Sequence, residues 1–313
     1  MADWRTIDKD VIHIDTQYVR SNLASNYLIG SNGEYAVIET GTCHTVPEVL
    51  STMADLKIDP GQIKYVIPTH IHLDHVGGAG LMMENFKEAS LVIHPRGARH
   101  VINPEKLIAG SIAVYGESKF HELYGELKPI DEQRVIVADD LHRLSLGSRE
   151  LLFLDTPGHA RHHFCIYDEL TRGFFTGDTF GLCYPELKHH PHGLIPTSSP
   201  IHFDPDAMFK SIDRLLDYKP KTMYLTHFDT IDNPQKRSDS LRSWINNYLD
   251  ICEKINPQNH EDSPRVEQEI WNLTRGKFDD SGVSPSSLER TLSLDLRLSA
   301  QGLVHWWINQ DAA

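Results

Sequence analysis

Cysteine is scarce in this sequence. Cys43, Cys165, Cys183 and Cys252 are scattered through 313 positions, and no two have the C-x-x-C spacing of a structural zinc or redox site. This absence argues against a thiolate metal site. We expect most of the thiols to be reduced and the protein to be cytoplasmic, because cytosolic proteins rarely carry disulfides.

Long apolar runs and a basic excess are also missing. No uninterrupted apolar run approaches the ~20 residues of a membrane span, and the opening Met-Ala-Asp-Trp-Arg-Thr lacks the basic start and apolar stretch of a secretory signal. With 30 Lys and Arg against 44 Asp and Glu, the net charge of -14 repels polyanions. We expect a soluble protein that binds neither membranes nor nucleic acid.

Histidine is the residue that the sequence has in excess. Nineteen histidines are many for this length, and histidine is both the commonest metal ligand and the side chain that titrates near neutral pH. Several are expected to be ordinary surface residues. The excess nevertheless points towards metal binding.

The predicted secondary structure alternates between strands and helices over most of the chain. Hydrophobic spacing predicts a hairpin within 11–39, a helix over 45–56, a strand at 65–68, a helix near 78–86 and a strand at 91–93. Residues 95–129 are expected to form helices and loops inserted over a site. Short strands are predicted at 134–137, 150–154, 163–167 and 173–176, followed by a helix over 203–218 and a strand at 222–225.

After Asn233-Pro234 the sequence becomes polar and helical. Helices are predicted over 238–255, 266–275 and 286–307. We therefore divide the chain into a catalytic domain, 1–235, and a helical C-terminal extension, 236–313. The Trp306-Trp307 pair is expected to anchor the last helix in a core or in a homodimer contact, because large aromatic side chains dominate both.

The run Thr69-His70-Ile71-His72-Leu73-Asp74-His75 places four potential metal ligands in six positions at the end of a predicted strand. Alternation in extended chain points His70 and His72 the same way, and a turn into a helix brings Asp74 and His75 to a second point nearby. Imidazole and carboxylate ligands suit zinc, iron or manganese. A chance grouping of surface or core histidines is the alternative.

Three later segments weigh against chance. They are Thr156-Pro157-Gly158-His159, Thr176-Gly177-Asp178 and Leu225-Thr226-His227. In this order, after the H-x-H-x-D-H run, they resemble the metallo-β-lactamase superfamily over roughly residues 10 to 230, with glyoxalase II and the acyl-homoserine lactonases sharing the ligand pattern. The resemblance implies an α+β fold, a four-layer αββα sandwich with the site at one edge.

The resemblance also implies a ligand set for two divalent metal ions, with zinc favoured and iron or manganese as alternatives. His70, His72 and His159 would bind the first ion, Asp74, His75 and His227 the second, and Asp178 both. One position departs from the family, which usually has Asp-Thr-Gly where this chain has Glu39-Thr40-Gly41. We expect Glu39 to orient a ligand histidine through its longer arm.

The implied function is hydrolysis of a small ester, thioester, lactone or amide by a metal-bridging hydroxide. Two divalent ions, two aspartates and a hydroxide leave a site of about +1, which favours an anionic tetrahedral intermediate. The alternative is a diiron or mono-iron redox or oxygen-binding protein on the same fold. His72 favours hydrolysis, because diiron members usually carry Glu at that position.

Other candidate residues have two interpretations each. Asp74, Tyr115 and Tyr184 are the candidate catalytic residues; the tyrosines would donate to an oxyanion, or else simply pack in a lid. His163 would either hydrogen-bond a ligand or pack within a strand. His189, His190 and His192 would line the entrance to the site or form a solvated loop, with the loop favoured.

Overall fold

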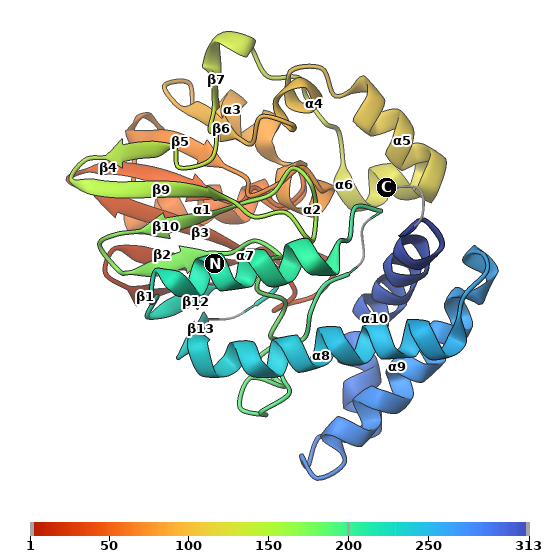
Figure 1. Cartoon of the computed structure of the whole chain (residues 1–313). Helices are drawn as coiled ribbons and strands as arrows, with labels where there is room; N and C mark the ends of the chain where they lie inside the picture. The colour runs from red at the N-terminus through yellow and green to blue at the C-terminus, as the bar shows by residue number, and fades with distance from the viewer. Residues whose placement is uncertain (1–2, 199–200, 229, 311–313) are drawn as a thin grey trace. The chain divides into compact units, whose positions relative to one another are not determined.

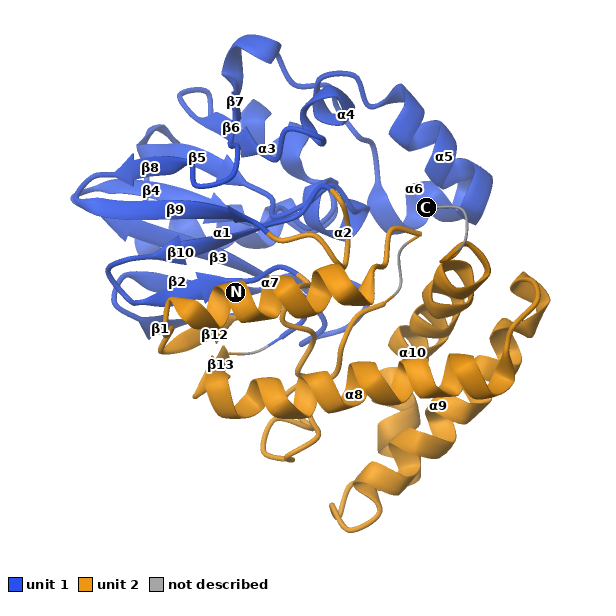
Figure 2. Ribbon diagram, viewed as in Figure 1, with its two compact units in different colours: residues 1–155, 162–177, 226–228 blue, residues 156–161, 178–225, 229–313 orange. Residues whose placement is uncertain are grey.

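The computed structural model describes residues 3–198, 201–228 and 230–310, which fall into two compact units (Figure 2). Unit 1 contains residues 1–155, 162–177 and 226–228, and unit 2 contains residues 156–161, 178–225 and 229–313. The chain therefore passes from one unit to the other within the predicted ligand segments. His159 and Asp178 belong to unit 2, and the other five predicted ligands belong to unit 1.

Seven strands of unit 1 form one mixed sheet in sequence order (Figure 1). They are β1 (Trp4–Asp8), β2 (Val11–Asp15), β3 (Ser25–Ser31), β4 (Glu34–Ile38), β5 (Ile63–Ile67), β6 (Ser90–Ile93) and β7 (Val135–Val137). Strands β1 to β4 pair antiparallel and β4 to β7 pair parallel. Parallel neighbours end at the same edge of a sheet. The segments after β4 and β5, which carry Glu39 and the histidine run, therefore emerge side by side.

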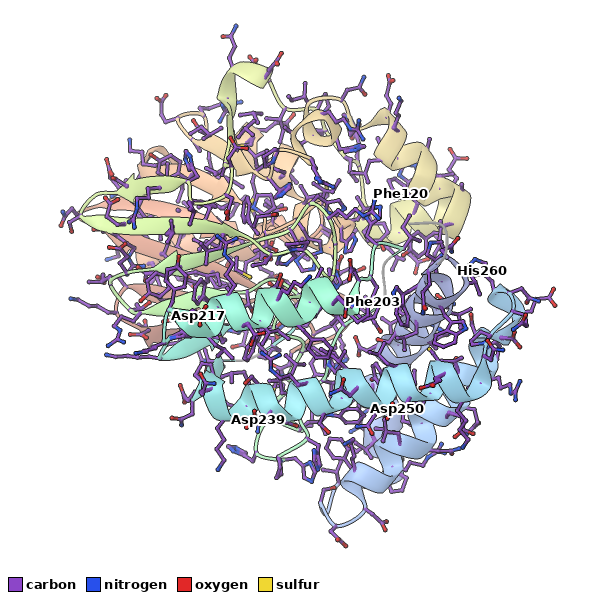
Figure 3. The ribbon with its side chains drawn as sticks, viewed as in Figure 1. Phe120, Phe203, Asp217, Asp239, Asp250 and His260 are labelled. Atoms are coloured by element: carbon purple, nitrogen blue, oxygen red, sulfur yellow. The ribbon has the colours of Figure 1, made fainter. Side chains whose placement is uncertain are left out.

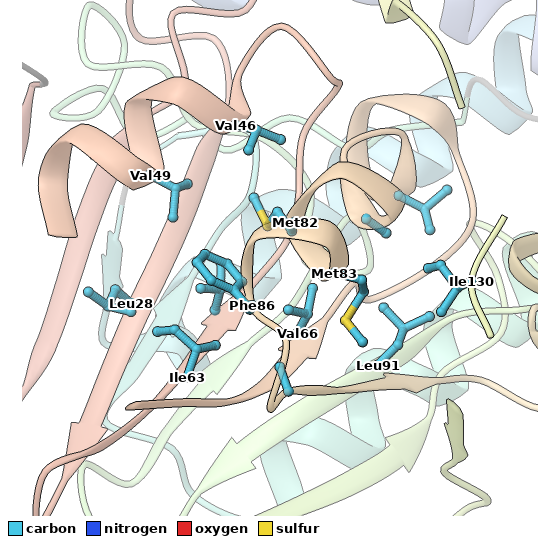
Figure 4. Close-up of a cluster of buried hydrophobic side chains, with 14 of the residues drawn as sticks. Leu28, Val46, Val49, Ile63, Val66, Met82, Met83, Phe86, Leu91 and Ile130 are labelled. Atoms are coloured by element: carbon cyan, nitrogen blue, oxygen red, sulfur yellow. The ribbon is translucent and has the colours of Figure 1, made fainter. Parts of the chain in front are cut away.

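The main hydrophobic core of unit 1 lies between this sheet and two helices, α1 (Val46–Leu56) and α3 (Ala79–Asn85) (Figure 4). Val46, Val49 and Met82 pack with Leu28 of β3 and Phe86, all of them 1% exposed or less. Each such side chain contributes about 1.5–3 kcal/mol when it leaves water. This core fixes the sheet edge from which the histidine run emerges.

The connection from β6 to β7 carries three helices. They are α4 (Ala98–Ile102), α5 (Glu105–Tyr115) and α6 (Glu117–Tyr124). Helix α5 buries no residue, whereas α6 buries Phe120, labelled in Figure 3, and Tyr124. Both pack with Leu73 of α2 (Leu73–Val76), the single turn that follows His72.

A second set of strands in unit 1 forms an antiparallel meander. Its members are β8 (Arg143–Leu146), β9 (Arg149–Asp155), β10 (Phe164–Asp168) and β11 (Gly173–Phe175). The run Leu151–Leu154 of β9 is at most 3% exposed, as expected of a strand covered on both faces. The predicted segments around His159 and Asp178 begin where β9 and β11 end.

Unit 2 is mainly helical. It contains α7 (Pro205–Asp217), the hairpin β12 (Thr222–Tyr224) and β13 (Thr230–Asp232), and then α8 (Pro234–Ile255), α9 (Ser263–Phe278) and α10 (Pro285–Ile308). Asp204 caps α7, where its side chain accepts a hydrogen bond from the Ala207 amide. Helices α8, α9 and α10 pack on one another and bury Trp244, Tyr248 and Leu296.

Most predicted elements are found close to their expected bounds, and the α+β class with C-terminal helices is confirmed. Helix α8 begins at Pro234 rather than Ser238, because proline suits the first turn of a helix. Strands β1, β8 and β13 were missed; they have only three to five residues each, which is too short for a clear periodic signal. The division at residue 235 stays a prediction. Among the helices in the described residues, none has the length and apolar character of a bilayer span.

Candidate metal centre

The histidine run starts just after β5, at the edge of the seven-stranded sheet. Extended chain carries His70 and His72, and the turn of α2 carries Asp74 and His75. His70 and His75 are fully buried, whereas 27% of the Asp74 side chain is exposed. The Asp74 carboxylate is therefore partly open to solvent, whereas the imidazoles of His70 and His75 are not.

Asp74, His75 and His227 bring their ligand atoms together within unit 1. The Asp74 Oδ2 lies 3.6 Å from His75 Nε2 and 3.4 Å from His227 Nε2, and one ligand atom from each residue fits within 4.8 Å. Two ligand atoms on one tetrahedral zinc ion, each ~2.1 Å from it, lie about 3.4 Å apart. The spacing and the donor types of these three side chains therefore suit a metal ion.

Glu39 holds His75 in this position. Its Oε1 lies 3.0 Å from His75 Nδ1, and it also accepts hydrogen bonds from the hydroxyls of Thr69, at 2.5 Å, and Thr226, at 2.8 Å. The Thr69 amide donates to Oε2 at 3.0 Å. Glu39 is 1% exposed, and its φ of 64° lies in the left-handed region. The expected contact between Glu39 and one of the predicted ligand histidines is present.

Two other imidazoles are held through the same nitrogen. His70 Nδ1 lies 3.1 Å from the Thr69 hydroxyl, and His227 Nδ1 lies 3.2 Å from the Leu23 carbonyl. Metal-binding histidines are commonly oriented by such a contact at the second ring nitrogen. The ligand atom of each would then be Nε2. His72 differs, because its Nδ1 lies 2.8 Å from His70 Nε2.

Within unit 2, His159 and Asp178 form a second group. His159 Nε2 lies 3.3 Å from Asp178 Oδ2, and both residues are buried. The Thr197 hydroxyl lies 3.0 Å from His159 Nδ1 and donates to the Asp178 carbonyl at 3.1 Å. His159 therefore repeats the arrangement of His75, with a neutral hydroxyl in place of a carboxylate. Nothing in the sequence pointed to Thr197.

Asp74 is kept ionised by its neighbours. Burial alone would raise the pKa of its carboxyl, but the charge of His75, the hydrogen bond and charge of His227, and the charge of His72 together hold the pKa well below its ordinary value. A carboxylate held in this form is a ready ligand for a cation.

His162 and His163 pack around His70. The His163 ring centroid lies 4.9 Å from that of His70, and the His162 ring stacks at 6.1 Å. His163 is fully buried, and its Nε2 lies so close to Gly177 that a Cβ there would stand 2.4 Å away. His163 thus adjoins a predicted ligand through its ring, and His162 is a neighbour that the sequence interpretation missed.

The predicted tyrosines differ in their surroundings. Tyr115 is 43% exposed at the end of α5, with its ring centroid 5.7 Å from that of Tyr124. Tyr184 of unit 2 is fully buried, and its hydroxyl donates to the Asp295 carboxylate at 3.1 and 3.2 Å. A catalytic role for either one stays a prediction.

The His189 to His192 segment of unit 2 packs against its C-terminal helices. The His190 ring stacks on Phe278 at 4.3 Å, and the His192 carbonyl accepts a hydrogen bond from Trp244 Nε1 at 3.0 Å. Burial, followed by nearby positive charge, lowers the pKa of both histidines. These contacts leave His190 and His192 half-buried in the loop, while His189 is exposed, and a place for the segment at the entrance to the site stays a prediction.

Comparison with known proteins gives a consistent result. A model of the metallo-beta-lactamase superfamily matches residues 22–227. A metallo-beta-lactamase fold-containing protein of Sulfurisphaera tokodaii is 30% identical over 190 residues, which cover 59% of this chain and 67% of that protein. A hydroxyacylglutathione hydrolase of Nitrosomonas europaea is 28% identical over 213 residues, 66% of this chain and 61% of that protein.

The fold is also found among solved structures. A metallo-beta-lactamase family protein from Thermus thermophilus matches with a TM-score of 0.61 and 19% identity, over 100% of this chain and 93% of that one. At this identity the match shows the fold alone. It confirms the metallo-β-lactamase fold with C-terminal helices.

Proposed function

The chain belongs to the metallo-β-lactamase superfamily, and we propose that it is a dinuclear metal-dependent hydrolase acting on a small thioester. Esters, lactones and amides form the wider class of carbonyl substrates from which the thioester is chosen. The observation that carries the proposal is the grouping of Asp74, His75 and His227, in which the carboxylate oxygen lies 3.4 and 3.6 Å from the two imidazole nitrogens.

We assign the ligands by the pattern of the family. One ion would be held by His70, His72 and His159, the other by Asp74, His75 and His227, and both by Asp178. Support comes from four imidazoles whose Nδ1 is engaged by a protein oxygen, which selects Nε2 as the ligand atom; they are His70, His75, His159 and His227. For His72 the proposed ligand atom is Nδ1.

Two divalent ions, when bound, would polarise a carbonyl and lower the pKa of a coordinated water. The chain's own residues prepare that chemistry. Glu39 fixes the His75 ring through Nδ1 and so prevents it from turning away. Asp74 would contribute a full negative charge, because a carboxyl ordinarily loses its proton well below neutral pH. Substrate would approach from the side on which Asp74 is partly exposed.

The thioester is favoured over the other substrates for two reasons. The Nitrosomonas europaea relative is named for the hydrolysis of hydroxyacylglutathione, whose acyl group is joined to sulfur. A thiol has a pKa of ~8.5, so a thiolate leaves without a strong general acid. Hydrolysis of a thioester therefore requires no acidic side chain to protonate the leaving sulfur.

Metal analysis combined with an activity panel tests the proposal. Protein purified without added metal should contain about two zinc ions per chain and show no visible band. It should hydrolyse acyl thioesters, and chelation should abolish the activity until zinc is restored. About two iron ions with a band that changes under oxygen, and no thioesterase activity, would instead support the redox alternative.

A further inference from the structure

Three tyrosines of unit 1 lie in a row beside Asp74. Tyr18 and Tyr124 pack in the same apolar cluster as Leu73, the residue before Asp74, and the ring centroid of Tyr115 lies 5.7 Å from that of Tyr124. The negative charge of Asp74 acts on both Tyr18 and Tyr124. The three residues come from the loop between β2 and β3, from the end of α5 and from the end of α6. They converge from distant parts of the sequence on one predicted ligand.

Tyr18 is held there by a strained loop. Its neighbours Gln17 and Val19 have φ values of 54° and 59°, in the left-handed region that β-branched residues such as valine rarely adopt. Asp15 stabilises this conformation by accepting hydrogen bonds from the amides of Gln17, at 3.0 Å, and Asn22, at 2.8 Å. Strain of this kind persists only where surrounding contacts enforce it, and it is concentrated at functional sites.

An apolar cluster adjoins the tyrosine row. Leu73, the residue before Asp74, packs with Phe120 and Tyr124. Partly buried side chains complete the cluster: Tyr18, Leu107, Ile108, Ile112, Leu123 and Leu127. Helix α5 has no charged residue from Leu107 to Tyr115, and none of its side chains is fully buried. A partly buried, uncharged helix face therefore lies next to Leu73, the neighbour of a predicted metal ligand.

We propose that this region is the acyl subsite, in which Tyr18 and Tyr124 donate hydrogen bonds to the acyl carbonyl oxygen and the α5 face binds an aliphatic acyl chain. The inference rests on the proposed function, because it names the acyl half of the thioester. An aliphatic chain fits this face better than a polar group, since the face offers apolar contact from Ile108 and Ile112 and no charge to pair. Its continuity with Leu73 places the carbonyl end of such a chain near Asp74.

The tyrosines are suited to donate without losing their protons. A tyrosine hydroxyl ordinarily has a pKa of ~10. Both hydroxyls therefore stay protonated over the working pH range. A donor that strengthens its bond as charge develops on the carbonyl oxygen lowers the barrier without proton transfer. No covalent bond to either hydroxyl forms or breaks in this role.

Binding of non-hydrolysable ketones tests the hydroxyls. In S-(2-oxodecyl)cysteamine and S-(2-oxopropyl)cysteamine a methylene separates the carbonyl from sulfur, so that calorimetry on the zinc-loaded protein reports binding alone. Tyr18→Phe should weaken both ketones by about 5- to 10-fold, the effect of one lost hydrogen bond. The matched control is Tyr65→Phe on β5, which should leave both affinities unchanged. Equal affinities for wild type and Tyr18→Phe would overturn the donor role.

The acyl-chain face is tested with the same two ketones. Wild type should bind the decyl ketone at least tenfold more tightly than the propyl ketone, about the gain expected from a few buried methylenes. Ile108→Asn should erase that preference and keep the propyl affinity, whereas Val114→Asn, at a 75% exposed position of the same helix, should preserve it. Equal binding of both ketones by wild type would refute the subsite even if thioesters are hydrolysed. A retained preference without hydrolysis would refute the proposed function alone.

Discussion

In each of the two groups of predicted ligands a protein oxygen orients one histidine ring, but the chemical type of that oxygen differs between the groups. In unit 1 the His75 ring is held by the carboxylate of Glu39, and in unit 2 the His159 ring is held by the hydroxyl of Thr197. The first contact carries a full charge and the second carries none. A charged partner raises the basicity of the imidazole, so the two histidines should contribute unequally to metal binding.

Glu39 and Thr197, the two residues that orient these rings, also differ in the number of hydrogen bonds that they make. Glu39 accepts hydrogen bonds from Thr69 and Thr226 as well as contacting His75, and its backbone lies in the left-handed region. Thr197 bridges only to the Asp178 carbonyl and the His159 ring among the contacts described. Removing Glu39 should therefore disturb more of the site than removing Thr197.

The largest effect is expected from Asp178→Ala. Under the proposed assignment Asp178 contacts both ions, and its loss leaves two cations facing each other without the carboxylate between them. Metal content should fall below two ions per chain, and activity should be abolished. Elemental analysis and thioester turnover measure both effects.

Asp213→Ala is the matched control for this substitution, because Asp213 lies on α7 of the same unit with its side chain 68% exposed. It should leave metal content and rate unchanged. If Asp178→Ala keeps two metals and near-normal turnover, Asp178 is not a ligand and the difference between the units has another origin.

Glu39→Gln comes next. The amide keeps the size of the side chain but removes the charge that faces His75, so the affinity for one metal should drop by about 10- to 100-fold. Competition with a chelator measures the change. Glu39→Asp restores the charge on a shorter arm and should give an intermediate affinity. If Glu39→Gln bound metal as tightly as wild type, the charge of Glu39 would have no effect on metal affinity.

Much of the unit 1 group could be predicted from sequence because its signal is local. Four potential ligands stand within six residues, and Glu39 lies at a position where a carboxylate is usual in the family. Thr197 follows His159 by 38 residues in a loop without periodicity, so no pattern linked them. The loop of Tyr18 also gave no sequence signal, because the residues with left-handed backbone in it are Gln17 and Val19 rather than glycine.

Thr197→Val is expected to have a smaller effect than Glu39→Gln. Valine keeps the branched shape but removes the hydroxyl, and a neutral hydrogen bond contributes about 0.5–1.5 kcal/mol. The Thr197 carbonyl, 3.4 Å from His159 Nδ1, remains in place to orient the ring. Metal affinity should fall by about 2- to 10-fold in the same chelator competition. If Thr197→Val lost more metal affinity than Glu39→Gln, Thr197 would matter more than Glu39 for metal binding, contrary to this prediction.

His163→Ala should have the smallest effect on metal binding. The His163 ring packs beside His70, with centroids 4.9 Å apart, but His70 Nδ1 is oriented by Thr69. Removing a fully buried ring leaves a void that should lower the free energy of unfolding by about 1–3 kcal/mol. Both metals should remain and the rate should fall only moderately, because the orientation of His70 does not depend on this ring.

Thermal unfolding, elemental analysis and turnover of the same His163→Ala preparation separate packing from ligation. A packing role predicts a lower melting temperature at full metal content, since the void weakens unit 1 without removing a donor. His162→Ala provides the comparison, because His162 stacks on the same ring at 6.1 Å and is also buried. If His163→Ala alone lost one metal equivalent, His163 would have to be counted among the ligands, and unit 1 would hold six of them.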